Sequence, residues 1–200
     1  MLSVGITGSF GTGKTAVAKL LARQGAKVLD ADEIAHRLIA PRGTCYPTIV
    51  RQFGKGILTR GRIDRRKLAR IVFADPRKLK QLEKIIHPAV GREIQAKLKG
   101  FAKNKRNRIV AVEVPLLFES GLNRLVDQVI VVKSSREVQW KRLTARSNMP
   151  KEEIAKRIQS QMPLQEKIKR ADFVVDNSGD LNNTQKQVRE IWDQLIKKYV

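Results

Sequence analysis

Short apolar runs alternate along this 200-residue chain with segments in which apolar residues recur every three or four positions. The runs are typical of strands buried on both faces of a parallel sheet, and they cover residues 2–7, 26–29, 109–114, 126–133 and 171–176. The helical spacing predicts helices over 14–24, about 33–38, 135–146 and 151–161, and a last helix that carries the apolar stripe of 188–199. This alternation predicts an α/β fold with a doubly wound five-stranded parallel sheet.

Helical insertions interrupt the alternation in two places. Residues 41–61 break into glycine, proline and short apolar pieces, and residues 62–101 contain three helical segments with separate start signals. The signals are an aspartate, an aspartate–proline pair and a histidine–proline pair: Asp64, Asp75-Pro76 and His87-Pro88. A second insertion, the helical pair over 135–161, separates the last two strands, and its helix over 135–146 opens on a sequence that resembles a capping box, residues 134–137. We therefore expect two helical appendages on the sheet.

A glycine-rich loop stands between the first strand and the first helix, at Gly8-Ser9-Phe10-Gly11-Thr12-Gly13-Lys14-Thr15. It fits the phosphate-binding pattern of glycine, four residues, glycine-lysine and serine or threonine, in the strand-to-helix context that this pattern requires. Such a loop turns backbone N–H groups toward phosphate oxygens at the positive end of a helix. We expect Lys14 to reach the β- and γ-phosphates of ATP and the Thr15 hydroxyl to ligate Mg²⁺. A glycine-rich turn without a ligand is the alternative.

Three carboxylates lie at or just after the ends of predicted strands. Asp30 and Asp32 follow the run 26–29, and Glu113 lies at the end of the run 109–114. Because ligands of open parallel sheets bind beyond the carboxyl ends of the strands, these acids are expected to face the nucleotide site, with Glu113 near Mg²⁺ and the nucleophile. If the strand continues past Asp30, the two aspartates point to opposite sides. Asp32 is placed to orient an acceptor hydroxyl and take its proton, although it could instead cap the following helix.

Two arginines of the second insertion, Arg142 and Arg146, are spaced four residues apart and share one face of a predicted helix. A guanidinium is always charged and can bind phosphate through two hydrogen bonds. These arginines could close over ATP as part of a lid that excludes water. The alternative is a solvated helix face.

The charge of the chain points to anionic partners. There are 41 Lys or Arg against 19 Asp or Glu, a net charge of +22, and residues 54–108 contribute +14 of it. Such an excess predicts phosphorylated small molecules or nucleic acid as ligands. An aromatic content of 5% leaves few side chains that could stack on single-stranded bases.

Other features of the composition bear on compartment. No apolar run approaches the roughly 18 residues of a membrane span, and the N-terminus does not look like a signal peptide. A single cysteine, Cys45, excludes an internal disulfide and is typical of a reducing cytoplasm. We expect a soluble, cytoplasmic protein, whose oligomeric state the sequence does not indicate.

Several segments carry a more specific signal, in one unbroken order from residue 2 to about residue 179. They are residues 5–8 leading into the phosphate loop, 30–36, Ile63-Asp64-Arg65, 82–88, Val114-Pro115-Leu116-Leu117-Phe118-Glu119, Arg157-Ile158-Gln159-Ser160-Gln161 and 171–179. Together these segments resemble the dephospho-coenzyme A kinase family of P-loop kinases. The loop alone is generic, whereas the His-Pro, Pro-Leu-Leu-Phe-Glu and Arg-Ile-x-Ser-Gln segments in combination are highly specific.

The resemblance implies Mg²⁺-dependent transfer of the ATP γ-phosphate to the ribose 3′-hydroxyl of dephospho-coenzyme A, the last step of coenzyme A synthesis. It implies a nucleotide-binding core of residues 1–53, 107–134 and 171–200, a helical acceptor-binding insertion of 54–106 and a lid of 135–170. The implied catalytic residues are Asp32, Lys14 and Arg142. The implied ATP-binding residues are Gly8, Phe10, Gly11, Thr12, Gly13, Lys14, Thr15, Arg142, Arg146, Asn177 and Gly179. The implied acceptor-binding residues are Asp32, Arg65, His87, Glu113, Pro115 and Leu116, and Thr15 is the implied metal ligand.

The chain departs from the family pattern at two loop positions. Ser9 stands where the family usually has a second glycine, and Phe10 replaces a small aliphatic residue. The residues alone leave the acceptor open, because a nucleoside or polynucleotide kinase, or a nucleic-acid-binding module that holds ATP structurally, fits the same loop and charge. The +22 charge exceeds what the implied chemistry requires, so an additional contact with RNA or a membrane surface stays open.

Overall fold

The computed structural model describes residues 1–104, 108–146 and 150–199. Its chain divides into two compact units, one formed by Met1–Asp30 with Leu98–Val200 and the other by Ala31–Lys97. The first unit contains the sheet, and the second is mainly helical. In the part of the chain that is described, no helix is long and apolar enough to cross a membrane.

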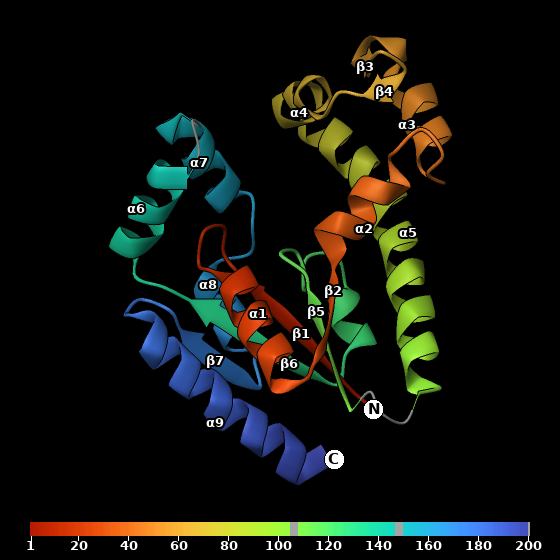
Figure 1. Cartoon of the computed structure of the whole chain (residues 1–200). Helices are drawn as coiled ribbons and strands as arrows, with labels where there is room; N and C mark the ends of the chain where they lie inside the picture. Colours follow the sequence, from red (N-terminus) through yellow and green to blue (C-terminus); the bar gives the residue numbers. More distant parts are fainter. Residues whose placement is uncertain (105–107, 147–149, 200) are drawn as a thin grey trace. The chain divides into compact units, whose positions relative to one another are not determined.

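The sheet of the first unit has five parallel strands in the order β2-β5-β1-β6-β7 (Figure 1). The strands are β1 (Leu2–Gly8), β2 (Lys27–Asp30), β5 (Ile109–Glu113), β6 (Gln128–Lys133) and β7 (Phe173–Asp176). Glu113 is in register with Ile6 on one side and with Asp30 on the other. The predicted doubly wound sheet is therefore confirmed. The ends of β2 and β5 bring Asp30 and Glu113 side by side at the carboxyl edge of the sheet.

Helices on this sheet supply the rest of its core. They are α1 (Lys14–Gln24), α6 (Arg136–Arg146), α7 (Lys151–Gln159), α8 (Leu164–Ile168) and α9 (Leu181–Tyr199), with a short 3₁₀ turn, η2 (Leu122–Leu125). α9 runs beside α1 and β7 (Figure 1), and its Val188, Ile191 and Leu195 are buried with Val17 and Leu21 of α1. α1 ends at Gly25, whose φ of 112° suits a residue without a Cβ, as the sequence predicted.

The second unit has its own apolar core. It contains α2 (Ala31–Leu38), α3 (Tyr46–Phe53), η1 (Lys55–Ile57), a hairpin of β3 (Leu58–Thr59) and β4 (Arg62–Ile63), α4 (Arg65–Ala74) and most of α5 (Pro76–Ala102). Ile49 and Ile57 are fully buried there, against Leu68 and Val72 of α4. Asp64 caps α4 as predicted, because its carboxylate accepts from the N–H groups of Arg66 and Lys67 at 2.9 and 3.2 Å.

Two expectations about this unit were wrong. Residues 41–61 are not irregular throughout, since α3 begins just after Cys45 with Pro47 in its first turn, where a missing N–H costs nothing. His87-Pro88 does not start a new helix, because α5 passes through Pro88 without a break. The apolar stripe of residues 82, 86, 90, 94 and 98 keeps helical phase across the proline, so packing on both sides outweighs the lost hydrogen bond.

Smaller corrections concern where helices begin. β2 does not continue past Asp30, and α2 begins at Ala31, so Asp32 lies inside its first turn instead of capping it. Ser135, not Ser134, caps α6, since its Oγ accepts from the N–H of Val138 at 3.3 Å. The Oγ of Ser134 is buried without a partner among the described residues. The short helix α8 was not predicted at all.

Candidate active site

The predicted phosphate loop joins β1 to α1 in the first unit. Gly8, Gly11 and Gly13 have φ values of 152°, 84° and 94°, which side-chain-bearing residues rarely adopt. A Cβ on Gly8 would collide with the carbonyl of Val132, and one on Gly13 with the amide of Asn177. The sequence therefore needs glycine at these positions, both for backbone conformation and for close approach of neighbouring chain segments.

The loop presents hydrogen-bond donors at the N-terminus of α1. In the described parts of the chain, the N–H groups of Gly11, Gly13 and Thr15 have no hydrogen-bond partner. The buried ammonium of Lys14 donates to the carbonyl of Ser9 at 3.0 Å and approaches that of Gly8 at 3.4 Å. Unpartnered N–H groups, a helix N-terminus and a buried cation are together suited to bind an anion.

The next residue of the loop meets a strand-end carboxylate. The hydroxyl of Thr15 donates to Oε1 of Glu113 at 2.7 Å, and Glu113 is only 7% exposed. Hydroxyl and carboxylate oxygens are ligands that suit Mg²⁺, which is bound through few protein oxygens and through substrate phosphates. The described residues contain no cluster of three or more His, Cys, Asp or Glu that could hold a metal. The oxygens present thus fit the metal that the sequence predicts.

Asn177 and Arg142 approach the same loop from later in the chain. Asn177 is 4% exposed, donates to the carbonyl of Thr12 at 2.8 Å and accepts from the hydroxyl of Thr184 at 3.0 Å. Nη1 of Arg142 is buried without a hydrogen-bond partner among the described residues, and it lies 3.6 Å from where a Cβ on Gly13 would be. A buried, unpartnered guanidinium nitrogen beside a phosphate loop is suited to meet an anion.

The structure gives less information about two further residues that are predicted to bind the nucleotide. Arg146 is the last residue of α6, and its side chain lies outside what the structure describes. Gly179 lies in the turn between β7 and α9.

Sequence reasoning missed the residues that hold the tip of the loop. The side chains of Gln139 in α6 and Gln161, just after α7, bond the peptide groups of Phe10. The guanidinium of Arg157 lies over the Phe10 ring, 5.7 Å from its centroid. Arg157 and Gln161 both belong to the Arg-Ile-x-Ser-Gln segment that carried the resemblance, so the motif was visible while its contact with the loop was not. The two departures from the family pattern, Ser9 and Phe10, lie at this contact.

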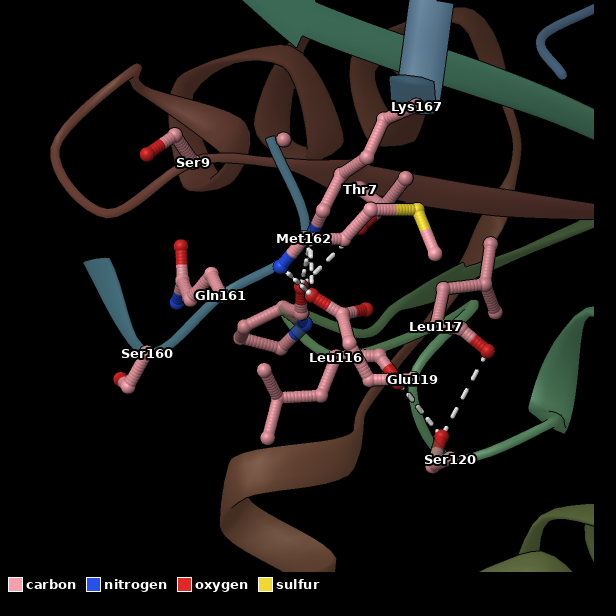
Figure 2. A network of polar contacts seen from close by, with 12 residues as sticks. Thr7, Ser9, Leu116, Leu117, Glu119, Ser120, Ser160, Gln161, Met162 and Lys167 are labelled. Atoms are coloured by element: carbon pink, nitrogen blue, oxygen red, sulfur yellow. Dashed lines mark hydrogen bonds and ion pairs between the residues drawn. The ribbon is translucent and has the colours of Figure 1, made fainter. Parts of the chain in front are cut away.

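A second unpredicted feature is a buried polar network beside the loop (Figure 2). Lys167 of α8 is completely buried, and its ammonium contacts Oε1 of Glu119 at 2.8 Å and the carbonyl of Pro115 at 2.9 Å. The Pro115 carbonyl also accepts from the Thr7 hydroxyl at 3.1 Å, and Glu119 accepts from the N–H of Met162 at 2.9 Å. The network ties the turn after β5 to the end of β1 and to the segment before α8.

Leu116, a predicted acceptor ligand, belongs to the same turn. Its carbonyl accepts from the Ser120 hydroxyl at 2.6 Å.

The remaining predicted residues lie in the second unit. Asp32 is exposed in the first turn of α2, and His87 is partly buried in α5. Arg65 of α4 contacts Nε2 of His36 in α2, a pairing that the sequence did not suggest. These residues therefore belong to helices that begin after β2.

The geometry can be compared with known proteins. The family model described as dephospho-CoA kinase matches residues 2–183. A dephospho-CoA kinase from Symbiobacterium thermophilum is 45% identical over 193 residues, which cover 96% of this chain and 80% of that protein.

Solved structures agree with this match. A crystal structure from Thermus thermophilus shares 37% identity at a TM-score of 0.81, covering 97% of each chain. The dephospho-CoA kinase from Campylobacter jejuni shares 28% identity at a TM-score of 0.72, covering 99% of this chain and 98% of that one. The phosphate loop, the sheet order and these similarities lead to one conclusion: the chain belongs to the dephospho-CoA kinase family of P-loop kinases.

Proposed function

We propose that ATP binds with its terminal phosphates in the loop of residues 8–15 and that Asp32 accepts the proton of the acceptor hydroxyl. The reaction is that of the family, ATP-dependent phosphorylation of dephospho-CoA at the ribose 3′-hydroxyl, which completes coenzyme A synthesis. The single observation that carries the proposed ATP site is the set of donors without partners around the loop: three N–H groups and Nη1 of Arg142. A buried donor without a partner, such as Nη1 of Arg142, is costly unless an anion meets it, and the three N–H groups are open to the same anion.

In this proposal Lys14 and Arg142 neutralise charge on the transferred phosphoryl group. Without nucleotide, Lys14 donates to loop carbonyls, and phosphate oxygens would be stronger, charged acceptors for it. Transfer of a phosphoryl group depends mostly on positioning and charge stabilisation, which fixed cations supply. Arg146 would add a second guanidinium.

Thr15 is the proposed protein ligand of Mg²⁺, with Glu113 beside it. The Thr15 hydroxyl donates a hydrogen bond to Glu113, so the lone pairs of its oxygen stay available for a metal. Held there, Mg²⁺ would supply positive charge that offsets the negative charge of the ATP phosphates. Glu113 would orient the Thr15 hydroxyl.

Asp32 is the proposed general base. Its exposed carboxylate lies two residues beyond Asp30, the end of β2, on the first turn of α2. As the 3′-oxygen bonds to the γ-phosphorus, its proton passes to Asp32 and the bond from that phosphorus to the ADP oxygen breaks. We assign the acceptor to residues 54–106 with Arg65, His87, Pro115 and Leu116, the lid to 135–170, and the adenine to Asn177 and Gly179. We also expect the reaction to occur in the cytoplasm.

The test compares acceptors and variants in one coupled assay for ADP. Dephospho-CoA, nucleosides and 5′-hydroxyl oligonucleotides are offered side by side, and only dephospho-CoA should support turnover.

Asp32→Asn should lower kcat a hundredfold or more, on the general-base estimate, with ATP affinity little changed. Glu33→Gln, which removes the neighbouring exposed carboxylate that pairs with Arg37, is the matched control and should keep its activity. Near-normal turnover of Asp32→Asn would remove Asp32 from the role of base.

A further inference from the structure

We propose that Gln139 and Gln161 are positioning residues, which hold the peptide groups of Phe10 and thereby fix the tip of the phosphate loop for ATP. The inference rests on the proposed binding of ATP in that loop. It assigns a function to two lid residues that neither contact the reacting atoms nor belong to the loop itself.

The contacts are complementary. Oε1 of Gln161 accepts from the N–H of Phe10 at 2.9 Å, and Nε2 of Gln139 donates to the carbonyl of Phe10. Nε2 of Gln139 also donates to the hydroxyl of Ser9 at 3.2 Å, and this glutamine is only 8% exposed. A backbone N–H and carbonyl that are both bonded by side chains have lost their rotational freedom, so the tip is held in one conformation.

Apolar and cationic side chains enclose the same tip. A Cβ on Gly11 would collide with Leu143 of α6, so that side chain is packed directly on the loop. Arg157 lies over the Phe10 ring, and its Nη2 donates to Glu153 at 2.9 Å. Ser9 and Phe10 thus supply a hydroxyl and a ring, each of which meets a lid residue.

Gln161 is itself held in place by the buried network in Figure 2. The next N–H along the chain, that of Met162, donates to Glu119, which pairs with the fully buried Lys167. Figure 2 shows Gln161 and Met162 on one segment, next to this network. The backbone of Gln161 is therefore anchored before ATP arrives, which is the condition for a positioning contact.

The contact between Gln161 and Phe10 has an alternative interpretation. The amide oxygen of Gln161 could occupy the place of a phosphate oxygen and have to leave when ATP binds. Positioning and displacement predict opposite changes in ATP affinity when the amide oxygen of Gln161 is removed. ATP binds more weakly if the oxygen positions the loop, and more tightly if the oxygen has to be displaced. The free N–H groups of Gly11, Gly13 and Thr15 favour positioning, because they already provide the donors for phosphate.

The experiment measures the Kd of ATP by titration calorimetry for the full chain, Gln161→Met, Lys14→Ala and a control, Gln165→Met. Methionine keeps the length of glutamine but removes the acceptor, and Gln165 is an exposed glutamine four residues away. Loss of one hydrogen bond that orders the loop should weaken ATP binding about five- to tenfold in Gln161→Met, with the control unchanged. Tighter binding, or a Kd within about twofold of the control, would overturn the inference.

Lys14→Ala separates this result from failure of the proposed ATP site. If Lys14→Ala binds ATP normally, the loop is not the phosphate site; if it binds poorly while Gln161→Met binds normally, only the positioning role fails. If Gln161→Met does not fold, the Kd of ATP for Gln139→Met decides whether the positioning role holds. In the double variant the two losses in affinity should combine to less than their product, because both side chains hold one residue. Independent, fully multiplicative losses would contradict a shared action on Phe10.

Discussion

At the scale of single residues, Lys167 shows how a buried charge is accommodated in this chain. Its ammonium has no exposed surface, yet it meets a carboxylate and a backbone carbonyl, and Glu119 keeps its side chain 19% exposed. Buried charges persist only when paired and hydrogen-bonded, because the desolvation cost is otherwise several kcal/mol. Such a pair is sensitive to the removal of either partner.

Lys167→Met should therefore lower the free energy of unfolding by about 2–4 kcal/mol, the smaller end reflecting the partial hydration of Glu119. Urea unfolding followed by circular dichroism provides the measurement. The matched control is Lys169→Met, two residues further along the chain, whose ion pair with Glu166 is largely solvated and should contribute little. A loss no greater than that of the control would show that the network is not a stabilising element.

Cys45 is a residue whose chemistry the fold suppresses. Burial raises the pKa of its thiol above the ordinary value, although a hydrogen bond with Thr44 and the charge of Arg92 act in the opposite direction. The neutral thiol fits its place in the apolar core of the second unit.

At the scale of elements, α5 is the clearest case of packing that overrides a local signal. Proline in a helix interior removes one backbone hydrogen bond and crowds the carbonyl four residues earlier, at a cost of about 3 kcal/mol. Pro88 is exposed, while its neighbours Ala89 and Val90 are buried. The helix is held by its apolar face on both sides of the proline.

Pro88→Ala should consequently raise the free energy of unfolding, by about 1–3 kcal/mol, since the helix regains a hydrogen bond and loses a steric clash. Thermal and urea unfolding would both report the gain. A lower stability in the variant would mean that the fixed backbone angle of proline is itself required at this point of α5.

The start of α4 is controlled by a single carboxylate. The backbone N–H of Lys67, followed by the hydroxyl of Thr59 and the N–H of Arg66, lowers the pKa of Asp64. A lowered pKa in the folded state means that the stabilisation is complete above the unfolded pKa of about 3.9 and is lost as the pH falls through the folded value.

The stability gap between the native chain and Asp64→Ala should accordingly be constant from about pH 5 to neutrality and should narrow below about pH 4. Urea titrations of both proteins at several pH values measure it. A gap that stayed the same in acid, or that widened, would rule out the charged cap as its source.

At the scale of the whole molecule, the charge of +22 is the feature that membership of the family does not explain. A net charge of this size favours binding of polyanions, and such binding would involve release of counterions and steep salt dependence. Catalysis depends on short contacts in buried surroundings, such as those of Lys14, where salt screens much less.

The two kinds of interaction should separate in a salt titration. Between about 50 and 200 mM salt, binding of a labelled duplex RNA should fall by orders of magnitude, whereas kcat with dephospho-CoA should change little. Fluorescence anisotropy and the ADP assay give the two curves. Parallel loss of RNA binding and of kcat would instead connect the excess of positive charge to turnover.

The sequence by itself determined the sheet, the phosphate loop and the family, because these depend on local patterns. A buried parallel strand needs a continuous apolar run, and a tight loop around phosphate needs glycine where φ is positive, so Gly11 and Gly13 could be identified without coordinates. The positions of Lys14, Thr15 and Glu113 followed from the strand-to-helix order, and the 2.7 Å contact between Thr15 and Glu113 agrees with them.

Only the tertiary structure decided which distant side chains meet. Continuity of α5 through Pro88, the ion pair of Lys167 with Glu119 and the contacts of Gln139 and Gln161 with Phe10 all join groups whose separate sequence signals are weak or misleading. Their energies come from packing and from burial of polar groups, which depend on three-dimensional neighbours and not on spacing along the chain. That is why the loop could be predicted from its own residues, while the side chains that hold it could not.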